Sequence, residues 1–144
     1  MNNGEVLSDL NVDYEPSAVS ILNDEELAIG ESSAGNSVRI YGIAGNALEE
    51  RKKFALSGAV TDLAYSPDGS HLVTADSNRK VTLFSVGNDY AKANSREWGF
   101  HTAKVNCVAW SPNSQYVASG GLDCSLILWS VEKPEKHKIQ TSAH

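Results

Sequence analysis

A segment of this chain occurs twice, 45 residues apart, and this repeat constrains the fold more than any other feature of the sequence. Residues 60–86 align with residues 105–131 without a gap, and both copies contain a Ser-Pro turn between apolar stretches. A fainter third copy runs from Ala18 to Tyr41, with a longer turn between Glu31 and Asn36. Internal repeats of about this length are typical of folds built from similar units set side by side.

Each copy divides into short strands separated by turn signals. In the third copy we expect strands at residues 105–110, 116–120 and 126–131, with Pro112 in the first turn because proline cannot donate to a strand ladder. Polar fourth strands are expected at residues 50–56, 96–100 and 136–142. Four-stranded units at this period are blades of a β-propeller, so the chain is expected to be an all-β propeller fragment of about three blades.

A propeller ring needs at least about four blades, so this chain alone is not expected to close one. The expected organisation is a tail or orphan outer strand at residues 1–13, degenerate blades at residues 14–57 and 58–100, a full blade at residues 101–142, and the start of a missing blade at residues 143–144. We therefore interpret the chain as a piece of a longer protein. Whether a second copy could supply the missing blades stays open.

The net charge of −6 disfavours nucleic acid or an anionic membrane as a partner, because both would repel an acidic surface. Basic clusters at residues 51–53 and 133–138 lie between repeats, where charged edge strands resist pairing with other sheets. No apolar run approaches the 18 or so residues of a membrane span, and no charged leader opens the chain. These features favour a soluble, cytoplasmic protein.

The reactive side chains suggest neither a metal site nor a cofactor. Cys107 and Cys124 lack the spacing of a zinc site, and Cys107 alternates with Val105 and Ala109, which predicts that it packs as a small apolar residue. The histidines have no ligand spacing, and no phosphate-binding glycine motif occurs.

Four residues of the third copy, namely His101, Ser119, Asp123 and Trp129, invite comparison with a catalytic triad. No Gly-x-Ser-x-Gly elbow surrounds Ser119, however, and the spacing resembles that of WD40 repeats, with Gly99-Phe-His101 near their Gly-His dipeptide and Trp129-Ser130 replacing Trp-Asp. This resemblance implies a structural hydrogen-bonded tetrad within one blade. The donors and acceptors of the four side chains are compatible with it.

The second copy has Leu56, Thr74, Asn78 and Phe84 at the tetrad positions. Without the histidine and the indole donor this network cannot form, so we expect the second blade to depend on apolar packing, for which Phe84 is suited. The first copy is also degenerate, with Tyr41 at the tryptophan position.

Several segments resemble a narrower group, the C-terminal propeller of the actin-interacting protein 1 family, WD-repeat proteins that act with cofilin. The segments that carry this resemblance are residues 14–16, 36–41, 58–66, 80–86, 107–112, 118–121 and 138–140. The resemblance implies a non-enzymatic module that binds actin filaments together with cofilin and promotes their disassembly. The family's best-known actin-contacting positions lie outside the matching region, so none is transferred to this chain.

Two other functions stay open: a WD40 scaffold subunit of another complex, and an inactive partial product. A serine hydrolase using Ser119 and His101 is a more distant alternative. The only binding candidates from the sequence are Asp89, Tyr90 and Lys92, which we expect to be exposed in the longest connection between strands.

Overall fold

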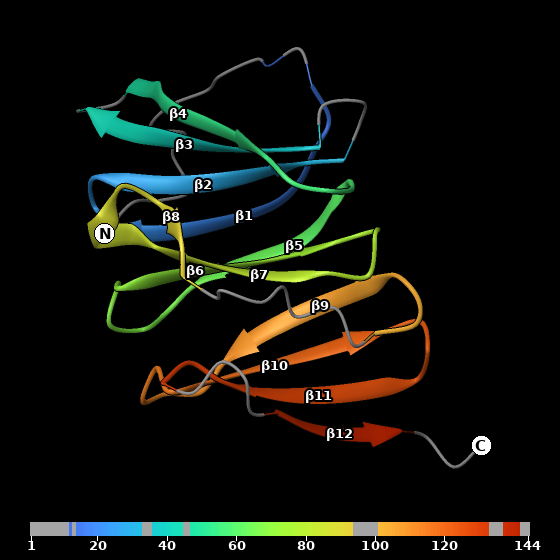
Figure 1. The fold of residues 1–144 in the computed structure, drawn as a ribbon. Coiled ribbons are helices and arrows are strands. Elements are labelled where there is room, and N and C mark those ends of the chain that lie inside the picture. The colour runs from blue at the N-terminus through green and yellow to red at the C-terminus, as the bar shows by residue number, and fades with distance from the viewer. Residues whose placement is uncertain are drawn as a thin grey trace, which may run out of the picture.

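The protein is described by a computed structural model that covers residues 12, 14–32, 36–44, 47–93, 101–132 and 137–141. Within these residues the chain forms three four-stranded antiparallel sheets, each built from consecutive strands (Figure 1). The first sheet contains β1 (Pro16–Asn23), β2 (Glu26–Glu31), β3 (Ser37–Ala44) and β4 (Ala47–Ala55). The second contains β5 (Val60–Tyr65), β6 (His71–Asp76), β7 (Val81–Ser85) and β8 (Ala91–Lys92), and the third contains β9 (Val105–Trp110), β10 (Tyr116–Gly121), β11 (Ser125–Ser130) and β12 (His137–Thr141).

The three sheets lie side by side in chain order, which is the arrangement of successive propeller blades (Figure 1). The all-β expectation is confirmed, and the described residues form an open row of sheets. The β2–β3, β6–β7 and β10–β11 ladders repeat the same register: Leu27 pairs with Tyr41, Leu72 with Phe84, and Val117 with Trp129. Tyr41 therefore occupies the tryptophan position of the first sheet, as the repeat predicts.

The Ser-Pro turns are closed by short polar side chains. In the second sheet, Asp68 Oδ1 accepts hydrogen bonds from the hydroxyls of Ser66 and Ser70 and from the Ser70 N–H. In the third sheet, Asn113 Oδ1 accepts from Ser111 Oγ and from the Gln115 N–H. Such side-chain turns explain why the segment after each first strand folds back sharply.

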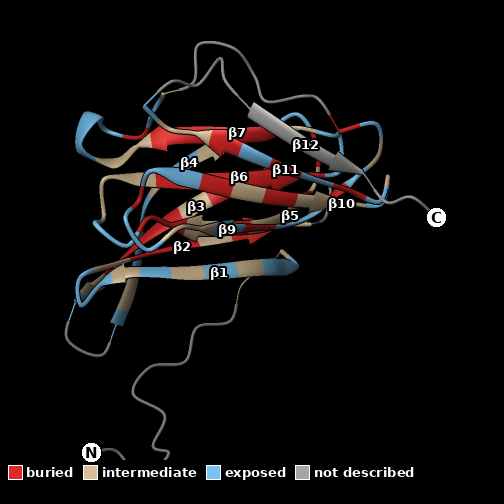
Figure 2. Ribbon diagram, turned by 90° about the horizontal axis from the view of Figure 1, so that it is seen from below, coloured by how far each residue is buried: buried red, intermediate tan, exposed pale blue. Residues whose placement is uncertain are grey.

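The core lies between the sheets. One cluster joins the first and second sheets and includes Val38, Ile40 and Leu72, and another joins the second and third and includes Leu83 and Trp129. The middle sheet is consequently buried on both faces, whereas β1 is largely exposed (Figure 2). Burial of apolar surface between neighbouring sheets therefore holds the row together.

Hydrogen bonds at β-bulges also connect the sheets. The first strand of each sheet has a register shift near its start, so that Ser17, Thr61 and Asn106 are extra residues. Ser17 Oγ donates to the Val60 carbonyl of the second sheet over 2.6 Å. One unit later, Thr61 Oγ1 donates to the Val105 carbonyl of the third sheet over 2.5 Å.

The bulge in β9 also overturns the prediction for Cys107. Gly121 pairs with Val105 and Gly120 pairs with Cys107, so the extra residue between them shifts the alternation of faces. Val105 and Val108 are buried as a result, and Cys107 is exposed. A strictly alternating strand would have placed Cys107 in the core.

The second sheet differs from expectation at its fourth strand. The predicted strand at residues 96–100 lies outside the described residues, and the strand that pairs with β7 is the two-residue β8. A short 3₁₀ turn, η1 (Val86–Asn88), is followed by Asp89 and Tyr90 with positive φ, which returns the chain to β7 at once. The expected orphan strand within residues 1–13 and the start of a further blade at residues 143–144 also lie outside the described residues, apart from Val12.

Candidate functional site

The four tetrad residues come from three strands and one turn of the third sheet. Trp129 lies on β11 and Ser119 on the neighbouring strand β10, while His101 precedes β9 and Asp123 lies in the β10–β11 turn. The His101 and Asp123 side chains lie next to Gly121 of β10, which pairs with Val105 at the start of β9. Exposed fractions of 0% for Trp129, 1% for Ser119 and 2% for His101 show that their contact is shielded from solvent.

A continuous chain of hydrogen bonds connects these side chains. Trp129 Nε1 donates to Ser119 Oγ over 2.8 Å, and the same oxygen lies 2.8 Å from His101 Nε2. Because the indole can only donate, the Ser119 hydroxyl is free to donate its own proton to Nε2. The imidazole proton then lies on Nδ1, from which it is donated to Asp123 Oδ2 at 3.1 Å.

Asp123 joins the end of this chain to the backbone. Oδ2 accepts from the Thr102 N–H at 2.7 Å, and Oδ1 accepts from the Ser125 N–H at 3.0 Å. Burial by itself raises the pKa of the Asp123 carboxyl, but the hydrogen bonds from Ser125, Thr102 and His101 outweigh burial and hold that pKa well below its ordinary value. The carboxylate thus stays ionised while it connects the loop before β9 to the turn after β10.

Gly121 makes room for this arrangement. A Cβ atom on Gly121 would lie 2.9 Å from both Asp123 Oδ1 and His101 Nδ1, which is closer than carbon approaches these atoms in folded proteins. The His–Asp pair therefore packs directly against the backbone of β10.

The tetrad is poorly suited to nucleophilic catalysis. A serine nucleophile must present its oxygen to a substrate, whereas Ser119 Oγ is buried and already contacts both the indole and the imidazole. No group of three or more metal-ligating side chains occurs among the described residues. The hydrogen bonds instead connect β10 and β11 to the loop before β9 and to the β10–β11 turn.

The second sheet has a carboxylate in an equivalent role, at a position that the sequence analysis missed. Asp76, which is 1% exposed, occupies the position of Gly121 in the repeat. Its Oδ1 accepts from the N–H groups of Asn78 and Lys80 at 2.9 and 3.1 Å, and its Oδ2 accepts from Ser57 Oγ at 2.8 Å. The available sequence signal was an acidic residue two positions before Asn78, which aligns with the tetrad aspartate.

Phe84 fills the tryptophan position of the second sheet by packing instead of hydrogen bonding. Its ring centroid lies 4.6 Å from that of Phe54 on β4, and Phe54 also contacts Tyr90 at 5.9 Å. At the serine position, Thr74 Oγ1 lies 3.4 Å from the Thr82 carbonyl. The expectation of apolar packing at Phe84 is thus matched by a cluster that joins the first and second sheets.

In the first sheet, the Tyr41 hydroxyl lies 2.7 Å from that of Tyr14, and the guanidinium of Arg39 lies 4.1 Å from the centre of the Tyr14 ring. Arg39 also pairs with Glu50 at 2.8 Å and Glu31 at 3.5 Å. Burial, with the hydrogen bond to Tyr41, raises the pKa of the Tyr14 hydroxyl. The first sheet therefore has its own polar cluster.

The sequence profile described as WD domain, G-beta repeat matches residues 50–85 and 94–130, which together make up just over half of the chain. The chain belongs to the WD40 repeat family. The second match begins before His101 and ends after Trp129, so one WD40 repeat contains the whole tetrad.

Among the described residues, no helix is long or apolar enough to span a bilayer.

Proteins similar to this WD40 chain include actin-interacting protein 1 of Drosophila melanogaster, which is 46% identical over 94% of the chain, and actin-interacting protein 1 of Caenorhabditis elegans, which is 37% identical over 92%. WD repeat-containing protein 1-B of Xenopus laevis is 42% identical over 93% of the chain. The chain covers 22% of the length of each of these three relatives.

Of the three loop candidates in this WD40 chain, Tyr90 does not have the expected exposure. Tyr90 is 9% exposed, and its hydroxyl bonds to Tyr65 at 2.7 Å and to the Glu26 carboxylate. The prediction of an exposed Tyr90 is wrong because the left-handed turn that follows η1 directs the ring between the first and second sheets. Asp89 has a side chain that is 89% exposed and pairs with Lys52 at 3.1 Å, and Lys92 is exposed on β8.

Proposed function

We propose that this chain is a non-enzymatic protein-interaction module of the actin cytoskeleton, which binds actin filaments together with cofilin and promotes their disassembly. The observation that carries the proposal is similarity over more than nine-tenths of the chain to two proteins named actin-interacting protein 1. The cofilin dependence and the disassembly come from the family resemblance carried by segments such as residues 14–16 and 36–41. A cytoplasmic location at the cytoskeleton belongs to the same proposal.

The geometry of the tetrad supports the non-enzymatic part of this proposal. The side chains that resemble a triad are buried and bonded to one another, so we propose that the tetrad His101, Ser119, Asp123 and Trp129 has a structural role. A serine-directed phosphonate probe should leave the folded chain unlabelled. Labelling at Ser119 would support the hydrolase alternative.

Sedimentation with actin filaments tests the proposed function. The purified chain is first shown to be folded by circular dichroism and soluble by size exclusion, and is then pelleted with filaments in the presence and absence of cofilin. Pelleting that increases with cofilin is the expected result, because a composite surface binds better than either partner alone. A folded chain that stays in the supernatant under both conditions contradicts the proposal and favours a WD40 scaffold of another complex or an inactive partial product.

A further inference from the structure

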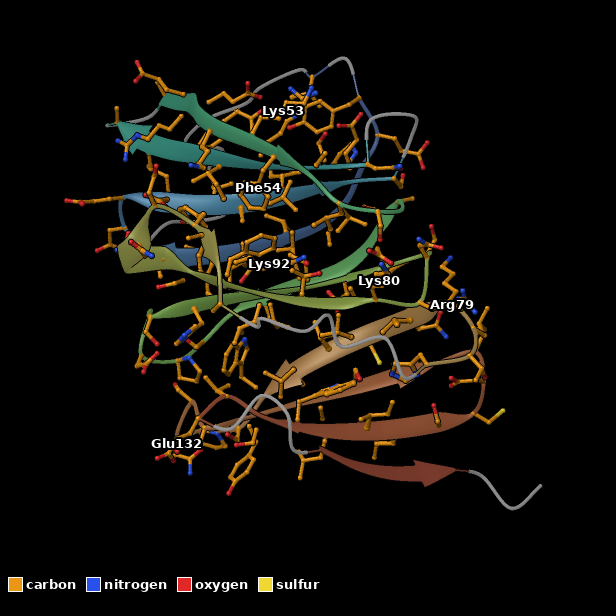
Figure 3. The ribbon with its side chains drawn as sticks, viewed as in Figure 1. Lys53, Phe54, Arg79, Lys80, Lys92 and Glu132 are labelled. Atoms are coloured by element: carbon orange, nitrogen blue, oxygen red, sulfur yellow. The ribbon has the colours of Figure 1, made fainter. Side chains whose placement is uncertain are left out.

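Exposed charge is unevenly distributed between the two ends of the sheets. Because every sheet is antiparallel, its turns alternate between the end where β1, β5 and β9 begin and the end where they finish. Five exposed acidic residues lie in the turns where these strands finish, namely Asp24, Glu25, Asp68, Asp89 and Glu132, whereas Glu15 is exposed just before β1 at the other end. At the other end, the β6–β7 turn carries the exposed Arg79 and the partly buried Lys80, and the exposed Lys104 directly precedes β9. Figure 3 shows Arg79 and Lys80 at the end opposite Glu132.

The segments that carry these cations leave neighbouring points of the second and third sheets, and one of them adjoins an exposed apolar side chain. Lys104 directly precedes Val105, whose carbonyl accepts a hydrogen bond from Thr61 of β5. Val60, next to Thr61, pairs with Asp76 at the end of β6, where the turn that carries Arg79 and Lys80 begins. The Leu122 N–H donates to the Lys104 carbonyl at 2.9 Å, and Leu122 is 63% exposed. We call Arg79, Lys80, Lys104 and Leu122 the basic surface.

The carboxylates at this end of the second and third sheets lie beneath the basic surface. Asp76 is 1% exposed and the side chain of Asp123 is 7% exposed. Both accept hydrogen bonds from the backbone of the turns above them. Among the described residues of these two sheets, the cations and Leu122 at this end are therefore more exposed than the carboxylates, although the protein as a whole carries a net charge of −6.

Those hydrogen bonds also fix the turns that present the basic surface. Asp76 holds the N–H groups on both sides of Arg79, which has a positive φ of 71°. Asp123 connects the segment before Lys104 to the turn that contains Leu122, through Thr102 and Ser125. Turns that are ordered before binding lose little conformational entropy in a complex, so a small charged surface on them can contribute to affinity.

We propose that the basic surface docks an acidic protein surface that also places an apolar side chain against Leu122. The choice of occupant follows from charge complementarity, since an acidic partner is attracted to this end and repelled by the opposite one. This inference rests on the proposed function, in which the partner is the actin filament.

The test compares two charge reversals of equal size. Arg79→Glu with Lys104→Glu alters the basic surface, while Lys53→Glu with Lys92→Glu changes the net charge equally on β4 and β8 (Figure 3). Circular dichroism first verifies that both variants fold. Binding is then measured to actin filaments by sedimentation and to fluorescent poly-L-glutamate by anisotropy at low salt, with Leu122→Ser as a third variant.

We expect the Arg79/Lys104 variant to bind both probes at least tenfold more weakly, which corresponds to about 1.4 kcal/mol, and the Lys53/Lys92 variant to stay within threefold of the wild type. Leu122→Ser should weaken filament binding while leaving poly-L-glutamate binding unchanged. Wild-type chain that binds poly-L-glutamate selectively through Arg79 and Lys104 but does not bind filaments would contradict the proposed function and support the surface.

Three results would overturn the inference. They are an equal loss of affinity in the two double variants, an affinity for filaments that the Arg79/Lys104 change leaves unaltered, and a wild-type chain that binds neither probe.

Discussion

The second and third sheets share a strand register but attach their turns with carboxylates from different positions. In the third sheet, Gly121 leaves space for the His101–Asp123 pair, and Asp123 accepts from the preceding loop and the following turn. In the second sheet, Asp76 occupies the position of Gly121 and makes the equivalent connections itself. The comparison shows that the shared requirement is a buried carboxylate between loop and turn, whereas the residue that supplies it can change.

The two sheets also differ at the tryptophan position. Trp129 donates a hydrogen bond to Ser119, while Phe84 packs against Phe54 of the neighbouring sheet. At this position the third sheet therefore has a hydrogen bond within itself, in addition to the packing of Trp129 against the second sheet, whereas the second sheet has an aromatic contact with the first. This difference leads to four predictions, given from the largest expected effect to the smallest.

Truncation at the tryptophan position tests the packing of both sheets. Trp129→Ala should lower the free energy of unfolding by about 3–5 kcal/mol, and Phe84→Ala by a smaller amount, because Trp129 is fully buried and also bonded. Urea denaturation of the whole chain measures both values. A loss below about 1 kcal/mol for Trp129→Ala would show that the third sheet does not depend on this side chain.

A methyl group at Gly121 tests whether the His–Asp pair needs the glycine. Gly121→Ala should cost about 1–3 kcal/mol of unfolding free energy, because the new Cβ would lie 2.9 Å from Asp123 Oδ1 and His101 Nδ1. Gly87→Ala is the matched control, since a Cβ there would have no neighbour within 4 Å. Equal melting temperatures for the two variants would contradict this account of Gly121.

A double-mutant cycle can convert the third sheet to the chemistry of the second. Trp129→Phe and His101→Leu should each cost about 1 kcal/mol in unfolding free energy, and the double variant should cost less than their sum because both act through Ser119. Filament binding per folded molecule should change little in either single variant. Strict additivity in thermal denaturation would mean that the chain of bonds has no cooperative contribution.

The pH dependence of stability should identify Asp123. Its pKa is depressed in the folded protein, so its contribution is present above the carboxyl pKa of the unfolded chain, near 4, and is lost as pH falls toward the folded value. Asp123→Asn should therefore lower the free energy of unfolding by about 1 kcal/mol at pH 7, a difference that shrinks below pH 4. Urea denaturation from pH 7 to pH 2.5 measures this trend, and a difference that is constant across the range would assign the effect to packing.

The sequence was sufficient to predict features that follow from the internal repeat and from residue spacing. The repeat predicted the sheets and the equivalence of Tyr41 and Trp129, which their pairing partners Leu27 and Val117 reproduce. The tetrad spacing also placed its four residues at one location, where hydrogen bonds connect them.

Features that depend on local backbone geometry were missed. The bulge at Asn106 exposes Cys107, and the left-handed turn at Asp89 buries Tyr90, although neither has a clear signal in residue type. Asp76 was missed because the alignment places the tetrad aspartate at Asn78, two residues later. For Cys107 and Tyr90, exposure is decided by where the side chain lies relative to one irregular backbone residue.

The bulge hydrogen bonds have a consequence for how freely such a chain can diverge. Ser17 and Thr61 donate to the main-chain carbonyls of Val60 and Val105, and a carbonyl is present whatever side chain stands at the accepting position. Substitutions in the accepting unit therefore leave the connection intact, and only the donor position is restricted to residues with a short polar side chain. Neighbouring units can then exchange a histidine for a leucine, or a tryptophan for a phenylalanine, without losing their alignment.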